Sequence, residues 1–254
     1  MIKILDTTLR DGEQTSGVSF ASEEKLSLAR LLLEDLCVDR VEVASALVSD
    51  GEFSTVKKIA RWANSKGLLN KVEVLGFVDG DKSVDWIRSA GINVMNLLCK
   101  GSLKHCAMQL GKKPEEHIAD IRHTLKCAEE AGITVNVYLE DWSNGMKNSP
   151  EYVFALIDAL SDTKIRRFML PDTLGVLNPA DTAKFCTQML TRYPNLQFDF
   201  HAHNDYDLAV ANVFAAVQAG INCVHVTVNG LGERAGNAPL SSVLAVLHDQ
   251  LGLS

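Results

Sequence analysis

The feature that most constrains the fold is an alternation of short apolar, β-branched runs with longer amphipathic segments, repeated eight times along the chain. The runs are predicted to be strands that begin near Ile2, Val38, Val72, Val94, Thr134, Arg167, Gln197 and Cys223. Strands that alternate with helical segments indicate a parallel sheet with crossover helices. The 254 residues are close to the length of roughly 250 that is typical of a (β/α)8 barrel. The sequence therefore predicts an α/β protein, a single-domain TIM barrel over residues 1–254.

An open, doubly wound sheet is the alternative arrangement of the same units. No GxGxxG motif follows the first strand, and eight units suit closure of the sheet into a barrel. Local signals mark the helix ends. Ser22 and Asn178 are predicted N-caps, Pro179 is predicted at the first helical position, and Gly132 is predicted to end a helix.

Composition limits the class of partner and the compartment. A net charge of −7 argues against nonspecific binding to nucleic acid or to anionic membranes, because both need a basic surface. The six cysteines include no CxxC pair, which indicates reduced thiols. No apolar run approaches the length of about 18 residues needed to cross a bilayer, and the charged N-terminus is not a signal peptide. These features predict a soluble, cytoplasmic protein.

Polar clusters follow the predicted strands at their carboxyl ends. They are RDGEQ after the first strand, EVAS in the second, YLED in the fifth, LPDT in the sixth, HAHND in the seventh and NGLGERAGN after the eighth. In a (β/α)8 barrel this face carries the chemistry. We therefore expect the functional site there.

A metal site is predicted at this face. His201 and His203 stand at i and i+2 near the end of the seventh strand, so both imidazoles point to the same side, with Cα atoms about 6.5–7 Å apart. Asp11, after the first strand, adds a carboxylate, and Asn237, after the eighth, adds a neutral oxygen. Closure of the barrel makes strands seven, eight and one neighbours, so these side chains are expected to converge.

This mixed nitrogen and oxygen set suits Mg²⁺, Mn²⁺ or Zn²⁺ and does not choose among them. The alternative is that the two histidines are polar strand residues with no ligand role. His225, inside the eighth strand, is expected to be a hydrogen-bonded histidine of the barrel wall. The other histidines fall in helix or loop contexts and are expected to be solvated: His105, His117, His123 and His248.

The ordered motifs resemble one known family. DTTLRDGEQ, VEVAS, LPDTLG, HAHND and NGLGERAGN are together similar to the DRE-type metal-dependent TIM barrels. This family includes isopropylmalate, homocitrate and citramalate synthases, hydroxymethylglutaryl-CoA lyases and 4-hydroxy-2-oxoacid aldolases. The resemblance covers essentially the whole chain. It implies a divalent metal cofactor, Mn²⁺ or Mg²⁺ with Zn²⁺ as a further candidate, and small-molecule substrates.

Two features favour the synthases over the lyases. GERAGN resembles the synthase loop, whereas the lyases typically carry a cysteine-containing, glycine-rich loop nearby, and no cysteine follows Cys223. The stretches VSFASEEKL, VEVLGFVDG, NLLCKGS and VNVYLEDWSNG are most similar to citramalate synthases. This resemblance implies an acyltransferase of amino-acid biosynthesis that condenses acetyl-CoA with pyruvate.

The resemblance assigns catalytic roles to three residues. Arg10 is expected beside the keto oxygen, where a permanently charged guanidinium would stabilise the alkoxide. An ion pair between Arg10 and Glu42 is the structural alternative, and both can hold if Glu42 orients Arg10. Glu140, at the end of the fifth strand, is the candidate general base for the acetyl methyl group. Its alternative is a hydrogen bond to a loop.

Further roles concern the oxo acid. Thr173 is the expected hydroxyl donor to its carboxylate, with a cap or turn role as the alternative, while Asp172 is expected to be structural. Leu75, Leu98 and Tyr138 are implied to form the wall that admits the methyl group of pyruvate and excludes a larger group. Plain barrel packing is the alternative for the two leucines.

The chain also departs from the family pattern. The synthases continue past the barrel into a linker region, which contributes a histidine to the neighbouring subunit, and then into a regulatory domain. The sequence ends at Ser254, so both regions, and with them the family's regulatory site, are expected to be absent. The resemblance further implies a homodimer. The alternatives to citramalate formation are isopropylmalate or homocitrate synthesis, cleavage by a lyase or aldolase, and a barrel that binds metal and oxo acid without turnover.

Overall fold

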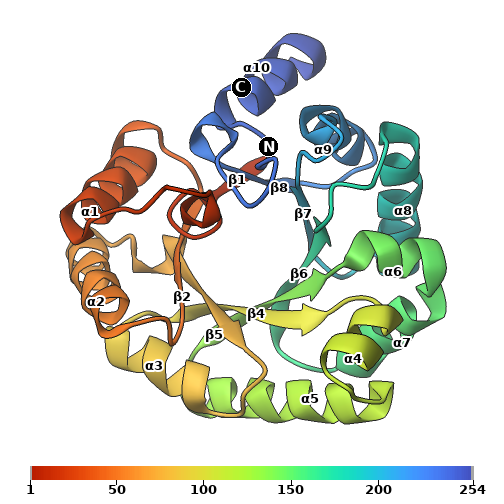
Figure 1. Cartoon of the computed structure of the whole chain (residues 1–254), viewed down its shortest axis with the longest axis horizontal. Coiled ribbons are helices and arrows are strands. Elements are labelled where there is room, and N and C mark those ends of the chain that lie inside the picture. Colours follow the sequence, from red (N-terminus) through yellow and green to blue (C-terminus); the bar gives the residue numbers. More distant parts are fainter. Residues whose placement is uncertain (1, 253–254) are drawn as a thin grey trace.

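The computed structural model describes residues 2–252, and its strands form a closed barrel (Figure 1). Each strand pairs in parallel with its neighbour in sequence, and the first strand closes the ring against the last. The predicted barrel is confirmed, with every strand beginning within two residues of its predicted start. The strands are β1 (Lys3–Asp6), β2 (Arg40–Ser45), β3 (Val72–Phe77), β4 (Val94–Lys100), β5 (Thr134–Glu140), β6 (Ile165–Asp172), β7 (Phe198–Ala202) and β8 (Cys223–Val226).

Helices form an outer ring around the strands (Figure 1). They are α1 (Ser22–Arg30), α2 (Asp50–Ser65), α3 (Lys82–Ala90), α4 (Leu103–Gln109), α5 (Pro114–Glu130), α6 (Trp142–Asn148), α7 (Pro150–Leu160), α8 (Pro179–Arg192), α9 (Ala209–Gln218) and α10 (Leu240–Leu251). Short turns of helix are η1 (Gly12–Gln14), η2 (Leu31–Asp35), η3 (Leu69–Lys71) and η4 (Val228–Gly230). No helix within residues 2–252 is long and apolar enough to span a membrane.

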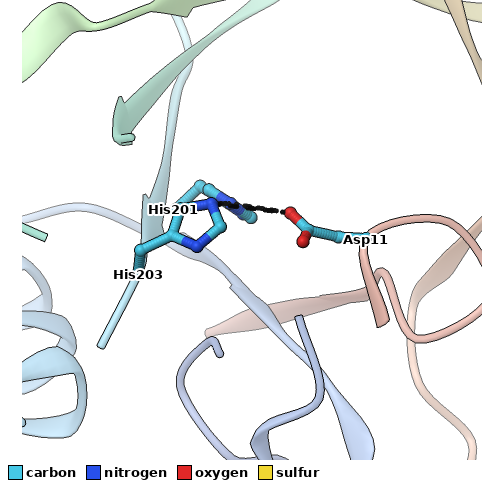
Figure 2. Close-up of side chains that lie close together, drawn as sticks. All are labelled: Asp11, His201 and His203. Carbon is cyan, nitrogen blue, oxygen red and sulfur yellow. Dashed lines mark hydrogen bonds and ion pairs between the residues drawn. The ribbon is translucent and has the colours of Figure 1, made fainter. Parts of the chain in front are cut away.

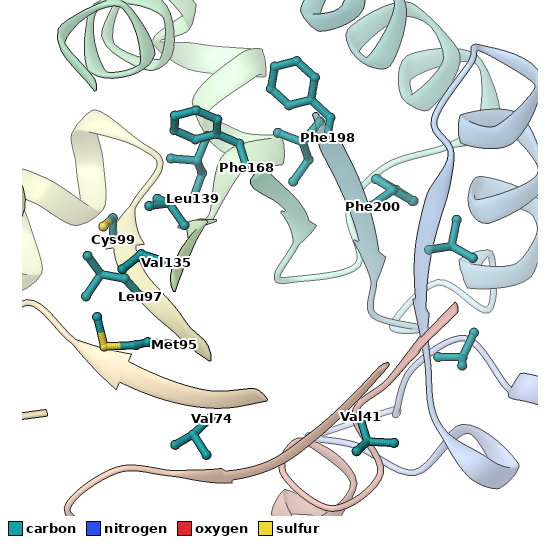
Figure 3. Close-up of a cluster of buried hydrophobic side chains, with 14 of the residues drawn as sticks. Val41, Val74, Met95, Leu97, Cys99, Val135, Leu139, Phe168, Phe198 and Phe200 are labelled. Carbon is teal, nitrogen blue, oxygen red and sulfur yellow. The ribbon is translucent and has the colours of Figure 1, made fainter. Parts of the chain in front are cut away.

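The main hydrophobic core lies between the barrel and the helices. Side chains that face outward from the strands, such as Val74, Leu97 and Phe200, belong to it (Figure 3). A second, smaller cluster fills part of the interior and includes Leu75 and Tyr138. Many other positions that face the interior are polar, and their side chains hydrogen-bond to one another there, as Arg40 does to Asp199.

Three of the predicted helix ends are confirmed and one is wrong; Gly132, with φ 72°, follows the C-cap residue of α5 as predicted. Asn178 caps α8, because its side chain accepts a hydrogen bond from the Asp181 amide at 2.9 Å, and Pro179 is the first helical residue. Ser22 was predicted as the cap of α1 but is already helical. The cap position is Ala21, whose backbone N–H donates to the Glu24 carboxylate at 2.7 Å. All six cysteines are free thiols.

Candidate functional site

Three buried side chains meet at the carboxyl ends of the strands. Asp11 follows β1, and His201 and His203 stand at the end of β7 and just beyond it, facing the carboxylate (Figure 2). The Nε2 atoms of the two histidines lie 3.3 Å apart. Oδ2 of Asp11 lies 3.3 Å from Nε2 of His201 and 3.6 Å from Nε2 of His203. We call these three residues the mouth cluster.

The spacing and protonation of the mouth cluster fit a divalent cation. Ligands about 2.0–2.2 Å from one ion stand roughly 3–3.5 Å from each other, which matches the observed separations. Burial lowers the pKa of His201, and it lowers that of His203 to about 4. Burial alone would raise the pKa of Asp11, but Arg10 and the hydrogen bond with His201 lower it well below its usual range. Neutral imidazoles and an ionised carboxylate are the ligand forms that metals require.

Asn237 adds an uncommitted oxygen to this region. Its Nδ2 donates to the carbonyl of Leu231 at 3.1 Å, whereas its buried Oδ1 has no hydrogen-bond partner among the described residues. Its backbone forms an isolated bridge with that of His203. A Cβ atom on Gly232 would lie 2.1 Å from Nδ2 of Asn237 and 3.2 Å from Oδ1 of Asp11. The lack of a side chain at Gly232 therefore lets the asparagine approach the mouth cluster.

Arg10 is held beside the mouth cluster by a buried polar chain. Its Nε lies 2.5 Å from the Glu42 carboxylate, and its Nη1 lies 3.3 Å from Asp11. Glu42 also accepts a hydrogen bond from Asn96 at 2.6 Å, and Asn96 accepts one from Asn136 at 2.7 Å. The ion pair anticipated as the alternative role of Arg10 is thus present. It fixes the guanidinium on the barrel axis rather than in solvent.

A cavity of about 200 Å³ opens next to the mouth cluster. The three residues expected to form the substrate wall, Leu75, Leu98 and Tyr138, all line it, and Phe77 extends the same wall. Phe77 was not anticipated. The cavity therefore combines an apolar wall with the charged groups of the mouth cluster and Arg10.

Thr173 and Glu140 lie on the rim of this cavity. The Thr173 hydroxyl accepts a hydrogen bond from the backbone N–H of Asp141 at 2.8 Å, which leaves its own proton free to be donated. Asp172 is structural, as expected, because its carboxylate accepts from the amides of Val176 and Leu177, each at 3.0 Å.

Two cationic or ionisable groups next to Glu140 were not anticipated. Lys100 forms an ion pair with Glu140, and the nitrogens of His105 lie 3.9 Å from Glu140 and 3.4 Å from Asp141. The expectation that His105 is solvated is therefore wrong, since it belongs to the rim. A usable signal existed for Lys100, which ends β4 and so lies on the same face as Glu140 at the end of β5.

His117 was also expected to be solvated and is instead buried. Its Nε2 accepts the backbone N–H of Lys100 at 3.0 Å, while its Nδ1 has no partner among the described residues. Burial and the nearby charge of Lys112 lower its pKa to about 4. The signal was present in the spacing, because Ile121 and Thr124 follow at i+4 and i+7 on the same buried face of α5.

A second group of close ligand atoms lies deeper in the barrel. Asp199, Cys223 and His225, which we call the inner cluster, bring their ligand atoms within 4.8 Å of one another. His225 is a hydrogen-bonded wall histidine, as expected, with Nδ1 3.1 Å from the Tyr138 hydroxyl and Nε2 3.4 Å from Asp199. The guanidinium of Arg40 contacts Asp199 at 3.0 Å and also contacts Cys223. The positively charged guanidinium of Arg40 therefore occupies the place beside these ligand atoms.

A mainly apolar groove of about 640 Å³ runs alongside the rim. Leu103, Met108 and Leu174 line it and are exposed, and His105 connects it to Glu140. The groove lies between α4 and α6, outside the cavity that holds the mouth cluster. Through His105 the groove reaches the neighbourhood of Glu140.

Comparison with known proteins gives consistent matches over the full length of the chain. A family model described as HMGL-like matches residues 1–253. A probable 2-isopropylmalate synthase of Ignicoccus hospitalis is 37% identical over 246 residues, which is 97% of this chain and 59% of the relative. A protein of Methanopyrus kandleri named as a candidate (R)-citramalate synthase is 36% identical over 253 residues, 99% of this chain and 48% of the relative.

The chain thus spans between about half and three fifths of the length of these relatives. Among solved structures, an HMG-CoA lyase of Bacillus subtilis superposes with a TM-score of 0.79 at 24% identity, covering 100% of this chain and 87% of the other. At that identity the likeness establishes the fold.

Proposed function

The chain belongs to the HMGL-like family, and from that premise we propose that it is a divalent-metal-dependent acyltransferase that joins acetyl-CoA to a 2-oxo acid. Pyruvate is the substrate we favour, with citramalate and free CoA as products. The observation that carries the proposal is the mouth cluster beside Arg10, at one end of a cavity of about 200 Å³. The similarity to synthases that are named for such condensations supports it.

Asp11, His201, His203 and Asn237 are the residues we propose to hold the metal. A divalent ion, Mn²⁺ or Mg²⁺ in the first instance, supplies a Lewis acid for the keto group when bound. Two imidazoles, one carboxylate and one amide leave room for oxygen atoms of the oxo acid. The unpartnered Oδ1 of Asn237 supports its inclusion.

Arg10 is proposed to stabilise the oxygen that becomes negatively charged when the keto carbon is attacked. Glu42 holds the guanidinium from behind, so little reorganisation is needed as charge develops. The Thr173 hydroxyl, with its proton free, would donate to the carboxylate of the oxo acid. These contacts would fix the keto carbon beside the rim.

Glu140 is proposed to take a proton from the acetyl methyl group. The resulting carbon nucleophile forms the new bond to the keto carbon, the keto oxygen gains a proton, and water cleaves the thioester to release CoA. Lys100 and His105 contact Glu140 and would hold its carboxylate in position for the transfer. The apolar groove at His105 is a suitable path for the pantetheine arm of acetyl-CoA.

The apolar wall supports pyruvate over larger acids. Leu75, Leu98 and Tyr138 would contact the methyl group, and Phe77 would close the same side. Steric exclusion by such a wall can be strong, whereas the burial of one extra methylene favours a larger acid by only about 1–3 kcal/mol. The second candidate is 2-oxoisovalerate, the substrate of isopropylmalate synthesis, because one relative at 37% identity is named for that activity.

A panel of oxo acids tests the proposal. Pyruvate, 2-oxobutyrate, 2-oxoisovalerate and 2-oxoglutarate would each be assayed for acetyl-CoA-dependent release of CoA with Mn²⁺. We expect pyruvate to give the highest kcat/KM. A Leu98→Ala variant should gain activity with 2-oxoisovalerate, with Leu97→Ala, which faces the outer core, as the matched control.

Other results of these assays would favour one of the alternative functions. A preference for 2-oxoisovalerate in the wild type would make the protein an isopropylmalate synthase and overturn the role of the wall. Cleavage of a hydroxyacyl-CoA or of a 4-hydroxy-2-oxo acid would make it a lyase or aldolase. Calorimetric binding of pyruvate and Mn²⁺ without turnover would identify a binding barrel.

A further inference from the structure

The opposite end of the barrel holds a separate cleft of about 300 Å³. The residues that line it stand at or next to the amino ends of the strands, as for Lys3 in β1, Arg40 in β2 and Arg167 in β6. The cleft is therefore an opening to the barrel interior on the face away from the mouth cluster.

Among residues 2–252, three cations on the rim of this cleft have no ion-pair partner. Lys3, Lys71 and Arg166 line it, and none has a carboxylate oxygen within the 4.0 Å ion-pair limit among residues 2–252. Asp39, on the same rim, accepts the backbone N–H of Ile4 at 2.8 Å. In a chain with a net charge of −7, this local excess of cations is unlike the average surface.

The floor of the cleft contains a buried arginine without hydrogen bonds. Arg167 is 6% exposed, and its nearest carboxylates, Glu73 and Asp199, lie 3.6 and 3.8 Å away. Its guanidinium donates no hydrogen bond to a described residue. Arg40 shares both acids and lies closer to them, at 3.4 Å to Glu73 and 3.0 Å to Asp199. The guanidinium nitrogens of Arg167 are not among the fully buried unpartnered atoms of residues 2–252, so they reach the cleft and can donate hydrogen bonds there.

We propose that this cleft binds a small phosphate-bearing anion. The planar fork of Arg167 matches two phosphate oxygens, and Lys3, Lys71 and Arg166 would add charge from the rim. The volume is at the lower end of the range for small-molecule sites, which suits a phosphorylated metabolite rather than a large cofactor. The proposal is independent of the acyltransferase proposal, because the two sites lie at opposite ends of the barrel.

Calorimetric titration of the whole chain with inorganic pyrophosphate tests the proposal. EDTA is present so that the probe cannot bind through a divalent ion at the mouth cluster, and ionic strength is held constant. The first variant removes the three rim charges: Lys3→Gln, Lys71→Gln and Arg166→Gln. The matched control removes three exposed charges of the outer helices that also lack a carboxylate within the 4.0 Å limit: Arg61→Gln, Lys82→Gln and Lys184→Gln.

The wild type and the control should bind pyrophosphate with the same affinity. The rim variant should bind about tenfold or more weakly, because each removed contact contributes roughly two- to fivefold. Arg167→Lys keeps the charge but loses the fork, and it should also weaken binding while the chain stays folded. Arg10→Gln, at the mouth, should bind as the wild type does.

Several results would overturn the proposal. They are no binding by the wild type, equal weakening in the rim variant and its control, or loss of binding in Arg10→Gln alone. Tighter binding of a single-stranded oligonucleotide than of pyrophosphate would assign the cleft to a polymer instead of a small ligand.

Discussion

The mouth cluster and the inner cluster contain similar groups at similar spacing, yet their surroundings differ. In the inner cluster both nitrogens of His225 have partners, and Arg40 contacts both Asp199 and Cys223. In the mouth cluster the only close contact between the imidazoles is through their Nε2 atoms. The nearby Arg10 is directed mainly at Glu42.

The difference teaches that proximity of ligand atoms does not by itself define a metal site. A guanidinium among the ligand atoms supplies the positive charge that an ion would bring, so the inner cluster is a self-contained ion-pair network. The mouth cluster has an uncommitted acceptor beside it in Asn237 and opens onto a cavity. The same residue types therefore have opposite predicted roles, and variants can separate them.

The largest expected effect is the loss of metal binding and activity in Asp11→Asn. Removal of the only carboxylate of the mouth cluster should abolish Mn²⁺ binding and lower the rate on the order of a thousandfold, because the ion contributes several kcal/mol to the transition state. Calorimetry with Mn²⁺ and CoA release measure the two quantities. Asp199→Asn makes the same chemical change in the inner cluster and should keep Mn²⁺ affinity. The reverse result would exchange the two assignments.

The next largest effect is on stability, and here the change in the inner cluster is expected to matter more than the change in the mouth cluster. Asp199→Asn should lower the free energy of unfolding by about 3 kcal/mol, because Arg40 and Arg167 lose a buried counter-charge. Asp11→Asn should cost less, since Arg10 keeps its ion pair with Glu42. Urea unfolding in EDTA measures both. Equal losses would contradict the view that only the inner cluster is self-contained.

A fourth buried histidine, outside both clusters, gives a pH-dependent effect. His117 has one bonded ring nitrogen and a pKa lowered to about 4, below its value near 6.5 in the unfolded chain. Between pH 4 and pH 6.5 this histidine therefore binds a proton more readily in the unfolded chain than in the folded chain. The stability contribution is complete above pH 6.5 and is lost as the pH falls toward 4, by about 2 kcal/mol. Urea unfolding should show a decline that is about 2 kcal/mol smaller in His117→Gln than in the wild type, since burial also lowers the pKa values of His201, His203 and His225.

The smallest expected effect concerns the hydroxyl that connects the two clusters. The Tyr138 hydroxyl lies 3.1 Å from His225 and 3.5 Å from Arg10. Tyr138→Phe should lower the unfolding free energy by about 1 kcal/mol and raise the KM for pyruvate a few-fold. A change in stability with unaltered kinetics would indicate that the clusters are independent.

The barrel and the mouth cluster could be predicted because they follow from backbone periodicity. Strand alternation places His201 and His203 on one face, and barrel closure brings Asp11 next to them, as observed. Phe77 could have been assigned to the cavity on the same basis, because it stands two residues after Leu75 in β3 and so faces the same side of the sheet.

Contacts between loops could not be predicted from the sequence. The approach of His105 to Glu140 depends on the path of α4 and on side-chain rotamers. Ser22 was misplaced by one position because a serine looks like a cap wherever a helix begins. The Glu24 carboxylate satisfies the amide of Ala21 without a capping side chain. The burial of His117 could have been predicted from the sequence, because its spacing places it on the apolar face of α5.

The separation of Asp11 from Asn237 along the chain has a consequence for synthesis of the protein. The proposed ligands come from the first unit and from the last two strand–helix units, and the bridge between His203 and Asn237 joins the end of β7 to the loop after β8. A nascent chain on the ribosome cannot assemble the set until residue 237 has emerged. Metal binding would then stabilise the closed barrel after synthesis, since a bound cation favours the state that holds all of its ligands.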